Sequence, residues 1–326
     1  MARTIKKQEM MKTMKHIPWM LLAVLAFATA CTQDELTDNP SATSQTLEIA
    51  SATIARAEGD EATTTDAGTG TVDGNWVEED EITVLFQDLY ATKATYTYTN
   101  GGFTSYNPID CNGQTAYAQA WTNYGVIKTK PYDGSPAQWE VETDQSGIGY
   151  RQSDFLYASS PGYVGAGTPA NFTFNHQTAK IVVHVRNSGI VAGKTELSMK
   201  VGNDNIYIDG ELGSLVNNVY IWTSGETKGT ITPYTLGQKS MSDGNTSLVS
   251  FGALVIPQTI SEGNTLFSFT VDEQTYYYEI PSAGITWSAG TEYTYNVTIG
   301  PDATTRSAGT PGCEVRLVEV QDMNAE

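Results

Sequence analysis

The sequence predicts an all-β protein built from β-sandwich domains, and three observations lead to this fold class. Short runs rich in β-branched and aromatic residues recur from Trp76 to Ile299, and many alternate apolar with polar positions. Clusters of Gly, Asn, Asp, Pro and Ser separate these runs. No window has the apolar periodicity of an amphipathic helix longer than about two or three turns.

The predicted strands follow one another along the chain. Ile82, Val84 and Phe86 alternate, and the turn Asn100-Gly101-Gly102 interrupts the next alternating run. The later runs are 155–158, 172–174, 181–185, 197–201, 206–208, 219–222, 248–256, 266–271, 276–280 and 293–299. A Gly/Pro-rich break at 159–171 predicts two domains, at 76–170 and 171–326.

Composition excludes several classes of protein. The chain has 326 residues with 18 basic and 37 acidic side chains, a formal net charge of −19. Nucleic-acid binding and polybasic membrane binding both need a positive surface, so this charge argues against them. With 17% charged and 40% hydrophobic residues, the chain is not expected to be disordered as a whole.

The first 30 residues read as an export signal. Cations precede the uncharged run 17–30, which is too short to span a bilayer comfortably and ends in small residues. Ala28-Thr29-Ala30-Cys31 resembles the lipobox of bacterial lipoproteins, and Thr-Gln-Asp-Glu after it resembles a surface-export signal of Bacteroidetes. The resemblance implies cleavage between Ala30 and Cys31, acylation (palmitate) of Cys31, and an outer-membrane anchor.

Residues 31–75 are expected to form a lipid tether, a short strand and a linker. Leu47, Ile49 and Ile54 carry a weak alternation typical of a strand. Arg56 follows directly and is the only basic residue between Cys31 and Lys93. It is either a site where a trypsin-like protease cuts before Ala57 or an ordinary linker residue.

The C-terminal segment predicts one more strand. Residues 301–312 read as a linker, and alternation resumes in 313–323, with Val315 and Leu317 on one face. This strand either pairs within its own domain or leaves it.

Candidate sites for chemistry are few, and we assign no catalytic residue, metal or cofactor. His176 and His184 lack metal-pair spacing, and no Cys/His cluster has zinc spacing. The acidic run 78–81 is expected to be solvated loop charge, and the oxygen-rich 203–210 segment a turn rather than a calcium loop. In Tyr276-Tyr277-Tyr278, the alternation expected of a strand competes with a sugar-stacking platform.

Cys111 and Cys313 are the remaining cysteines of the exported chain. Export places them where a disulfide is permitted, but spacing alone cannot pair them. A bond between them would prevent the C-terminal strand from leaving.

Several segments taken in order resemble the fimbrillin-like lipoproteins of Bacteroidales, the subunits of type V pili. They are 76–86, 94–103 (ATYTYTNGGF), 153–159, 172–185, 255–281 and 287–299. The resemblance implies two tandem transthyretin-like β-sandwich domains. It also implies assembly at the cell surface with other pilus subunits.

The same resemblance implies roles for the residues already named. A trypsin-like protease cuts after Arg56, the strand with Leu47, Ile49 and Ile54 leaves, and another subunit's C-terminal strand (313–323, with Val315 and Leu317) fills the groove. We expect a structural or adhesive subunit without catalysis. The alternative is a monomeric surface lipoprotein that binds glycan or a host ligand without polymerising.

Overall fold

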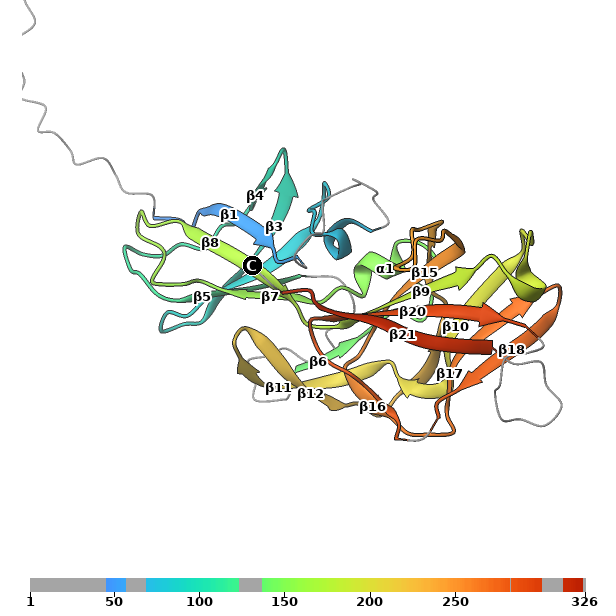
Figure 1. The fold of residues 1–326 in the computed structure, drawn as a ribbon. Helices are drawn as coiled ribbons and strands as arrows, with labels where there is room; N and C mark the ends of the chain where they lie inside the picture. The colour runs from blue at the N-terminus through green and yellow to red at the C-terminus, as the bar shows by residue number, and fades with distance from the viewer. Residues whose placement is uncertain (1–44, 57–68, 123–136, 282, 301–312, 325–326) are drawn as a thin grey trace, which may run out of the picture. The chain divides into compact units, whose positions relative to one another are not determined.

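β-Sheets and the turns between them account for almost all of the described chain, which confirms the all-β prediction (Figure 1). The computed structural model describes residues 45–56, 69–122, 137–281, 283–300 and 313–324. They belong to the second of the chain's two compact units, Ala42–Glu326. The helical elements are single turns: η1 (Gly70–Asp73), α1 (Gly149–Gln152) and η2 (Gly189–Val191). Within the described ranges, no helix has the length and apolar character needed to cross a bilayer.

The largest sheet has seven strands and is formed by the N-terminal half of the described chain. In order across the sheet they are β1 (Ile49–Ile54), β8 (Ala170–His176), β7 (Leu156–Ser159), β5 (Ala118–Thr122), β2 (Glu81–Phe86), β3 (Thr92–Thr99) and β4 (Gly102–Thr104). The edge strand β1 runs parallel to β8. It is therefore an addition to a sheet that is otherwise antiparallel.

The C-terminal half of the described chain supplies the strands of the other sheets, except for β6, which comes from the N-terminal half. A five-stranded sheet contains, in order, β14 (Tyr234–Gly237), β15 (Ser247–Val255), β9 (Ala179–Arg186), β20 (Thr291–Ile299) and β21 (Cys313–Asp322). A four-stranded sheet contains β13 (Lys228–Ile231), β10 (Leu197–Tyr207), β17 (Thr265–Val271) and β18 (Gln274–Glu279). A three-stranded sheet contains, in order, β12 (Val219–Ser224), β11 (Asp209–Val216) and β6 (Ala137–Glu140). A two-stranded sheet pairs β16 (Gln258–Ile260) with β19 (Ile285–Trp287).

Alternation and turn chemistry explain how the strands form. Ile82, Val84 and Phe86 of β2 are fully buried, as their spacing predicts. Asn100 and Gly101 connect β3 to β4 with φ values of 53° and 85°, a conformation that Asn and Gly adopt at low cost in tight hairpins.

Two large hydrophobic clusters hold the sheets together. One lies under the seven-stranded sheet and includes Leu47 and Ile54 of the β1 segment. The other fills the space between the sheets of the second half and also takes Trp139 from β6. The domain boundary near residue 170 stays a prediction.

One charged residue contradicts the sequence interpretation. Asp80, in the acidic run expected to be solvated, is 1% exposed. Its carboxylate pairs with Arg151 and accepts a hydrogen bond from the Val77 N–H at 2.8 Å. An alternation pattern cannot reveal such a pair, because the partner lies 71 residues away.

Candidate functional site

The predicted site residues fall into described and undescribed parts of the chain. Ala30, Cys31 and Ala57 lie outside the described residues, so the expected lipidation and processing positions stay predictions. The strand residues at both ends of the chain are described. They form two edge strands in different sheets, β1 and β21.

Hydrogen bonds on both sides hold the β1 segment in place. The Leu47 N–H donates to the Ile109 carbonyl at 2.8 Å, and the Tyr96 hydroxyl donates to the Leu47 carbonyl at 2.8 Å. At the other end, the Ala55 N–H donates to the Phe174 carbonyl at 2.8 Å. Between them the register follows β8, with an irregularity between Ile49 and Ser51.

The apolar side chains of this segment cover a hydrophobic core. Leu47 is 1% and Ile54 is 7% exposed, and Ile49 and Ala52 pack against the same cluster. Ser51 is exposed, and its hydroxyl donates to Asn171 Oδ1 at 2.7 Å. The polar residues of β1 therefore face outward. Removing the strand would uncover a groove lined by that core.

Trp76 contacts both β1 and the aromatic side chains of the core beneath it. Its indole N–H donates to the Ala52 carbonyl at 2.8 Å. Its ring meets Phe103 and Phe174 edge-on, with centroids 4.9 and 5.1 Å away. Such contacts are favourable for aromatic pairs, so Trp76 forms part of the groove wall.

Arg56 lies directly after β1 and packs against the turn that ends η1. Its Nη2 donates to the Gly74 carbonyl at 3.0 Å and to Asn75 Oδ1 at 3.5 Å. Gly74 has a φ of 75°, and a Cβ there would lie 2.3 Å from Arg56 Nε. Only glycine allows this approach without a shift. A protease that binds Arg56 must first lift its side chain off this turn.

The apolar side chains of the C-terminal strand β21 are less buried than those of the β1 segment. It pairs antiparallel with β20 at the edge of the five-stranded sheet, with an irregularity opposite Thr294 and Tyr295. Cys313 is buried and Val315 is half-buried, but Leu317 is 48% and Val320 is 55% exposed. The predicted donor face is therefore only partly covered in its own subunit.

A clasp fixes the end of β21. The Asn324 amide accepts from the His176 N–H at 2.7 Å and donates to the His176 carbonyl at 3.0 Å. Met323 is buried, and its N–H donates to the Gly290 carbonyl at 2.8 Å. Figure 1 shows β21, in red, running back toward β8, whose last residue is His176.

The ends of β1 and β21 meet at one small cavity of about 20 Å³. Arg56 and Met323 both line it, together with Lys180 and Glu292. The Lys180 ammonium lies 2.9 Å from the Glu292 carboxylate, and both side chains are largely buried. Burial alone would lower the pKa of Lys180, but the Glu292 charge outweighs it and holds that pKa above its ordinary value. The two predicted segments thus end at the same cavity, a relationship that the sequence did not predict.

The two cysteines are free and lie in different clusters. Cys111 is buried under the seven-stranded sheet, and Cys313 is buried among the sheets of the second half. Burial raises the pKa of the Cys313 thiol to about 12, so the thiol stays protonated and unreactive at neutral pH. Among the described residues, no disulfide holds β21 in place.

The other singled-out residues have structural partners. His176 Nδ1 lies 2.8 Å from Asp154 Oδ1, and His184 Nδ1 lies 2.7 Å from the Ser250 hydroxyl. Tyr277 is 44% exposed between a buried Tyr276 and a half-buried Tyr278, as strand alternation predicts. Among the residues that the structure describes, no group of His, Cys, Asp or Glu is arranged to hold a metal ion.

Comparisons with known proteins agree with this geometry. The sequence model of the family described as Fimbrillin-like matches residues 63–315. None of the curated proteins matches the sequence.

Two solved structures share the fold. A candidate cell adhesion protein of Bacteroides ovatus has 17% identity and a TM-score of 0.58, covering 86% of this chain and 98% of its own. A candidate cell adhesion protein of Bacteroides uniformis has 18% identity and a TM-score of 0.52, covering 83% and 96%. At these identities the likeness concerns the fold alone.

Proposed function

The chain belongs to the fimbrillin-like family, and on that premise we propose that it is a surface pilus subunit that assembles by strand exchange. In this proposal β1 leaves its sheet, and β21 of a second subunit replaces it. One contrast carries the proposal: β1 buries its apolar side chains over a core, whereas β21 leaves apolar side chains half exposed. Transfer of β21 to another subunit is favourable if it buries more apolar surface there than in its own sheet.

The exchange has a clear energetic basis. Loss of β1 would leave the β8 edge without its ladder partners and the core without its cover, and such an edge readily pairs with another strand. An incoming strand restores the main-chain ladder and fills the pockets with alternate side chains. Leu317 and Val320 would then gain burial, at about 25 cal/mol for each Å² of apolar surface removed from water.

The apolar spacing of the two strands supports one register. In β1 and the residues just before it, the core-facing positions Leu47, Ile49 and Ala52 are spaced by two and then three positions, and the longer interval contains a register irregularity. Val315, Leu317 and Val320 have the same spacing, and β21 also has its irregularity in the longer interval. We infer that β21 enters parallel to β8 with these residues in those sites.

Export and processing rest on the sequence. In the proposal, Ala30 and Cys31 are separated during export, lipid on Cys31 anchors the subunit at the outer membrane, and the chain is displayed on the cell surface. A trypsin-like protease then cuts between Arg56 and Ala57. Because Arg56 follows β1 directly, this cut separates the whole strand from the domain.

The cavity shared by the two strand ends supports an order of events. Departure of β1 with Arg56 removes one wall of the cavity in which Met323 is buried. The end of β21 then loses packing and is held by the Asn324 clasp, the hydrogen bond from the Met323 N–H to the Gly290 carbonyl, and its pairing with β20. Cleavage would thus both open the acceptor groove and loosen the donor strand.

The test is made on protein sheared from the native cell surface, as wild type and as Arg56→Ala. We expect the wild type to begin at Ala57 and to give a ladder of detergent-resistant oligomers on an unheated denaturing gel. The variant should begin at a lipidated Cys31 and run as a monomer. A monomeric wild type that begins at Cys31 would refute strand exchange and favour an anchored lipoprotein that binds glycan or a host ligand.

A further inference from the structure

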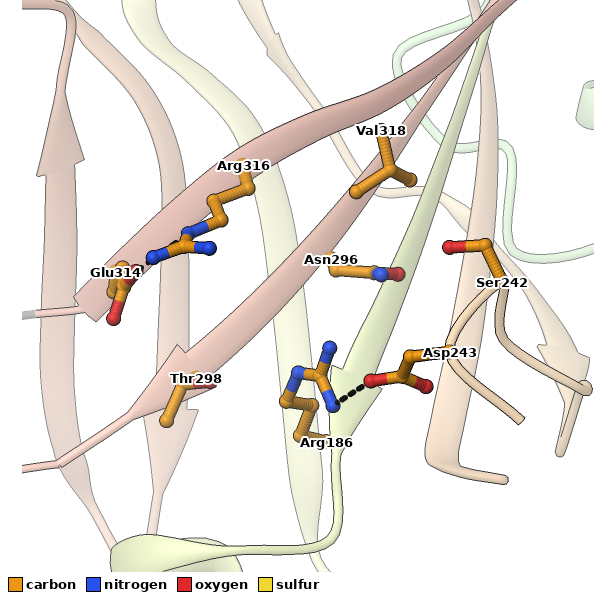
Figure 2. Close-up of a pocket in the computed structure, with 8 residues that line it drawn as sticks. All are labelled: Arg186, Ser242, Asp243, Asn296, Thr298, Glu314, Arg316 and Val318. Atoms are coloured by element: carbon orange, nitrogen blue, oxygen red, sulfur yellow. Dashed lines mark hydrogen bonds and ion pairs between the residues drawn. The ribbon is translucent and has the colours of Figure 1, made fainter. Parts of the chain in front are cut away.

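A polar cavity of about 340 Å³ lies on the outer face of the five-stranded sheet (Figure 2). Its lining comes from three adjacent strands and the segment between β14 and β15. The lining residues are Arg186 of β9, Asn296 and Thr298 of β20, Glu314, Arg316 and Val318 of β21, and Ser242 and Asp243. Neither strand exchange nor the clasp uses this cavity.

The charges that line the cavity are balanced. Arg186 Nη1 lies 2.5 Å from Asp243 Oδ2, and Arg316 Nε lies 2.8 Å from Glu314 Oε1. Each pair presents a donor beside an acceptor, and the four charges sum to zero. The hydroxyls of Ser242 and Thr298 extend this set of paired donors and acceptors.

Asn296 occupies the centre of this lining. In the sheet, Asn296 is paired with Arg316 of β21 on one side and with His184 of β9 on the other. Figure 2 shows its amide pointing toward the side of Ser242. The side chain is 5% exposed, and its Oδ1 accepts no hydrogen bond. A buried amide oxygen without a donor is unfavourable, so a ligand group that supplies a donor here is favoured.

We propose that this cavity binds one neutral sugar unit, a hexose or N-acetylhexosamine. Each sugar hydroxyl both donates and accepts, which matches a lining that alternates carboxylates, guanidinium groups, an amide and hydroxyls. The volume falls within the range of small-molecule sites, about 300–1,000 Å³. None of the described residues that line the cavity is aromatic, so recognition by them depends on the hydroxyl pattern rather than on ring stacking.

Other ligand classes fit less well. An anion would meet Asp243 and Glu314, which already neutralise both arginines. The Arg186 hydrogen bond keeps the pKa of Asp243 below its ordinary value, so that carboxylate stays charged at neutral pH. Among the described lining residues, a hydrophobic ligand would find one apolar side chain, Val318, and it would desolvate the polar groups without pairing them.

The cavity exists only while β21 lies in its own sheet, because Glu314, Arg316 and Val318 belong to that strand. A bound sugar therefore stabilises the state in which β21 has not left. This consequence rests on the proposed function, whereas sugar binding itself does not.

The binding test uses the full-length chain in detergent, titrated calorimetrically with glucose, galactose, mannose, N-acetylglucosamine, glucuronate and inorganic phosphate. We expect at least one neutral sugar to bind with a Kd on the order of 1 mM, a typical scale for a single small ligand with few contacts. Asn296→Ala and Glu314→Gln should each weaken it about fivefold or more. Glu319→Gln, on the same strand but outside the cavity, should leave it unchanged.

The assignment would be overturned if no neutral sugar binds at about 50 mM, far above the expected Kd. It would also be overturned if glucuronate or phosphate binds more tightly than every neutral sugar, or if sugar binding is unchanged in both Asn296→Ala and Glu314→Gln. The consequence for β21 is measured separately by hydrogen exchange of residues 313–322. At a sugar concentration of about ten times Kd, exchange should slow about tenfold. Sugar binding without slower exchange would refute only the proposed stabilisation of β21 in its own sheet. Neither measurement requires a pilus.

Discussion

Asn324 and His176, 148 residues apart, are joined by two hydrogen bonds between the Asn324 side-chain amide and the backbone N–H and carbonyl of His176. His176 ends β8, the strand that carries β1. Asn324 follows β21. The clasp therefore connects the strand proposed to be donated with the strand that borders the proposed groove.

Asn324→Ala tests whether this clasp holds β21. The variant loses both hydrogen bonds, and we expect local opening of β21 to become easier by about 1–2 kcal/mol. Exchange of amides in 313–322 should accelerate about tenfold, while β2 and β17 keep their protection. Glu319→Ala, an exposed position on β21, is the control and should exchange as wild type does. Unchanged exchange in Asn324→Ala would mean that pairing with β20 alone holds the strand.

Local sequence patterns were enough to predict many of the strands and several turns, but not β5, β6 or β11. The alternation of Ile82, Val84 and Phe86 reflects burial on one face of a sheet, and Asn100-Gly101 reflects a backbone with positive φ. Both signals lie within a few residues, where propensity and periodicity act. The turn at Asp272 and Glu273 has positive φ at both residues but lacks glycine, so its sequence gave no comparable signal.

Contacts between distant segments could not be predicted. Nothing near Asp80 indicates that Arg151 will bury it, and nothing near Met323 indicates that its side chain shares a cavity with Arg56. Asn296 illustrates the same limit, because the lack of a hydrogen-bond donor to its Oδ1 depends on neighbouring residues in two other strands. The positions of the two terminal strands were predictable, whereas the cavity and the hydrogen bonds that link their ends to the same region were not.

Gly74→Ala should expose the processing site. The new methyl group would occupy the space of Arg56 Nε, 2.3 Å away, and so displace the arginine from its hydrogen bonds. We expect trypsin to cut after Arg56 several-fold faster, measured by mass spectrometry at short digestion times. Gly101→Ala is the matched control, since its φ of 85° is equally strained but no atom lies within 4 Å. Equal rates in both variants would show that Arg56 is not protected by this turn.

Leu47→Ala tests whether β1 depends on its buried anchor. Leu47 is 1% exposed, so truncation leaves a cavity and should lower the free energy of unfolding by about 2–5 kcal/mol. Ser51→Ala, which loses one exposed hydrogen bond, should change it by about 0.5 kcal/mol or less. Urea denaturation of uncleaved protein measures both. Similar values for the two variants would argue that β1 adds little to the core.

Leu317→Asp separates the donor role from folding. Leu317 is 48% exposed, so the monomer should keep its stability within about 1 kcal/mol. In the proposed polymer the same carboxylate would be buried in the site of Ile49 without a partner, and the oligomer ladder should disappear. Val318→Asp is the control, because Val318 lines the outer cavity instead of the donor face. A normal ladder from Leu317→Asp would refute the inferred register.

The buried pair of Lys180 and Glu292 predicts a specific pH dependence. Burial alone would raise the pKa of Glu292, but the Lys180 charge and hydrogen bonds from Lys180 and Thr294 together hold it below its ordinary value of 4.5. A lowered folded pKa adds stability above the unfolded pKa, and this stability is lost as pH falls through the folded pKa. The contribution should therefore be complete near neutral pH and decline below about pH 4.5.

Glu292→Gln isolates this contribution from that of the other carboxylates. At about pH 7 the variant leaves Lys180 buried without its counter-charge and should be about 3–5 kcal/mol less stable. As the pH is lowered, wild-type Glu292 becomes protonated, and the difference between the two proteins should shrink. Urea titrations of both proteins from pH 7 downward measure it, with the exposed Glu319→Gln as control. A difference that stays constant with pH would mean that the effect of the substitution is steric rather than electrostatic.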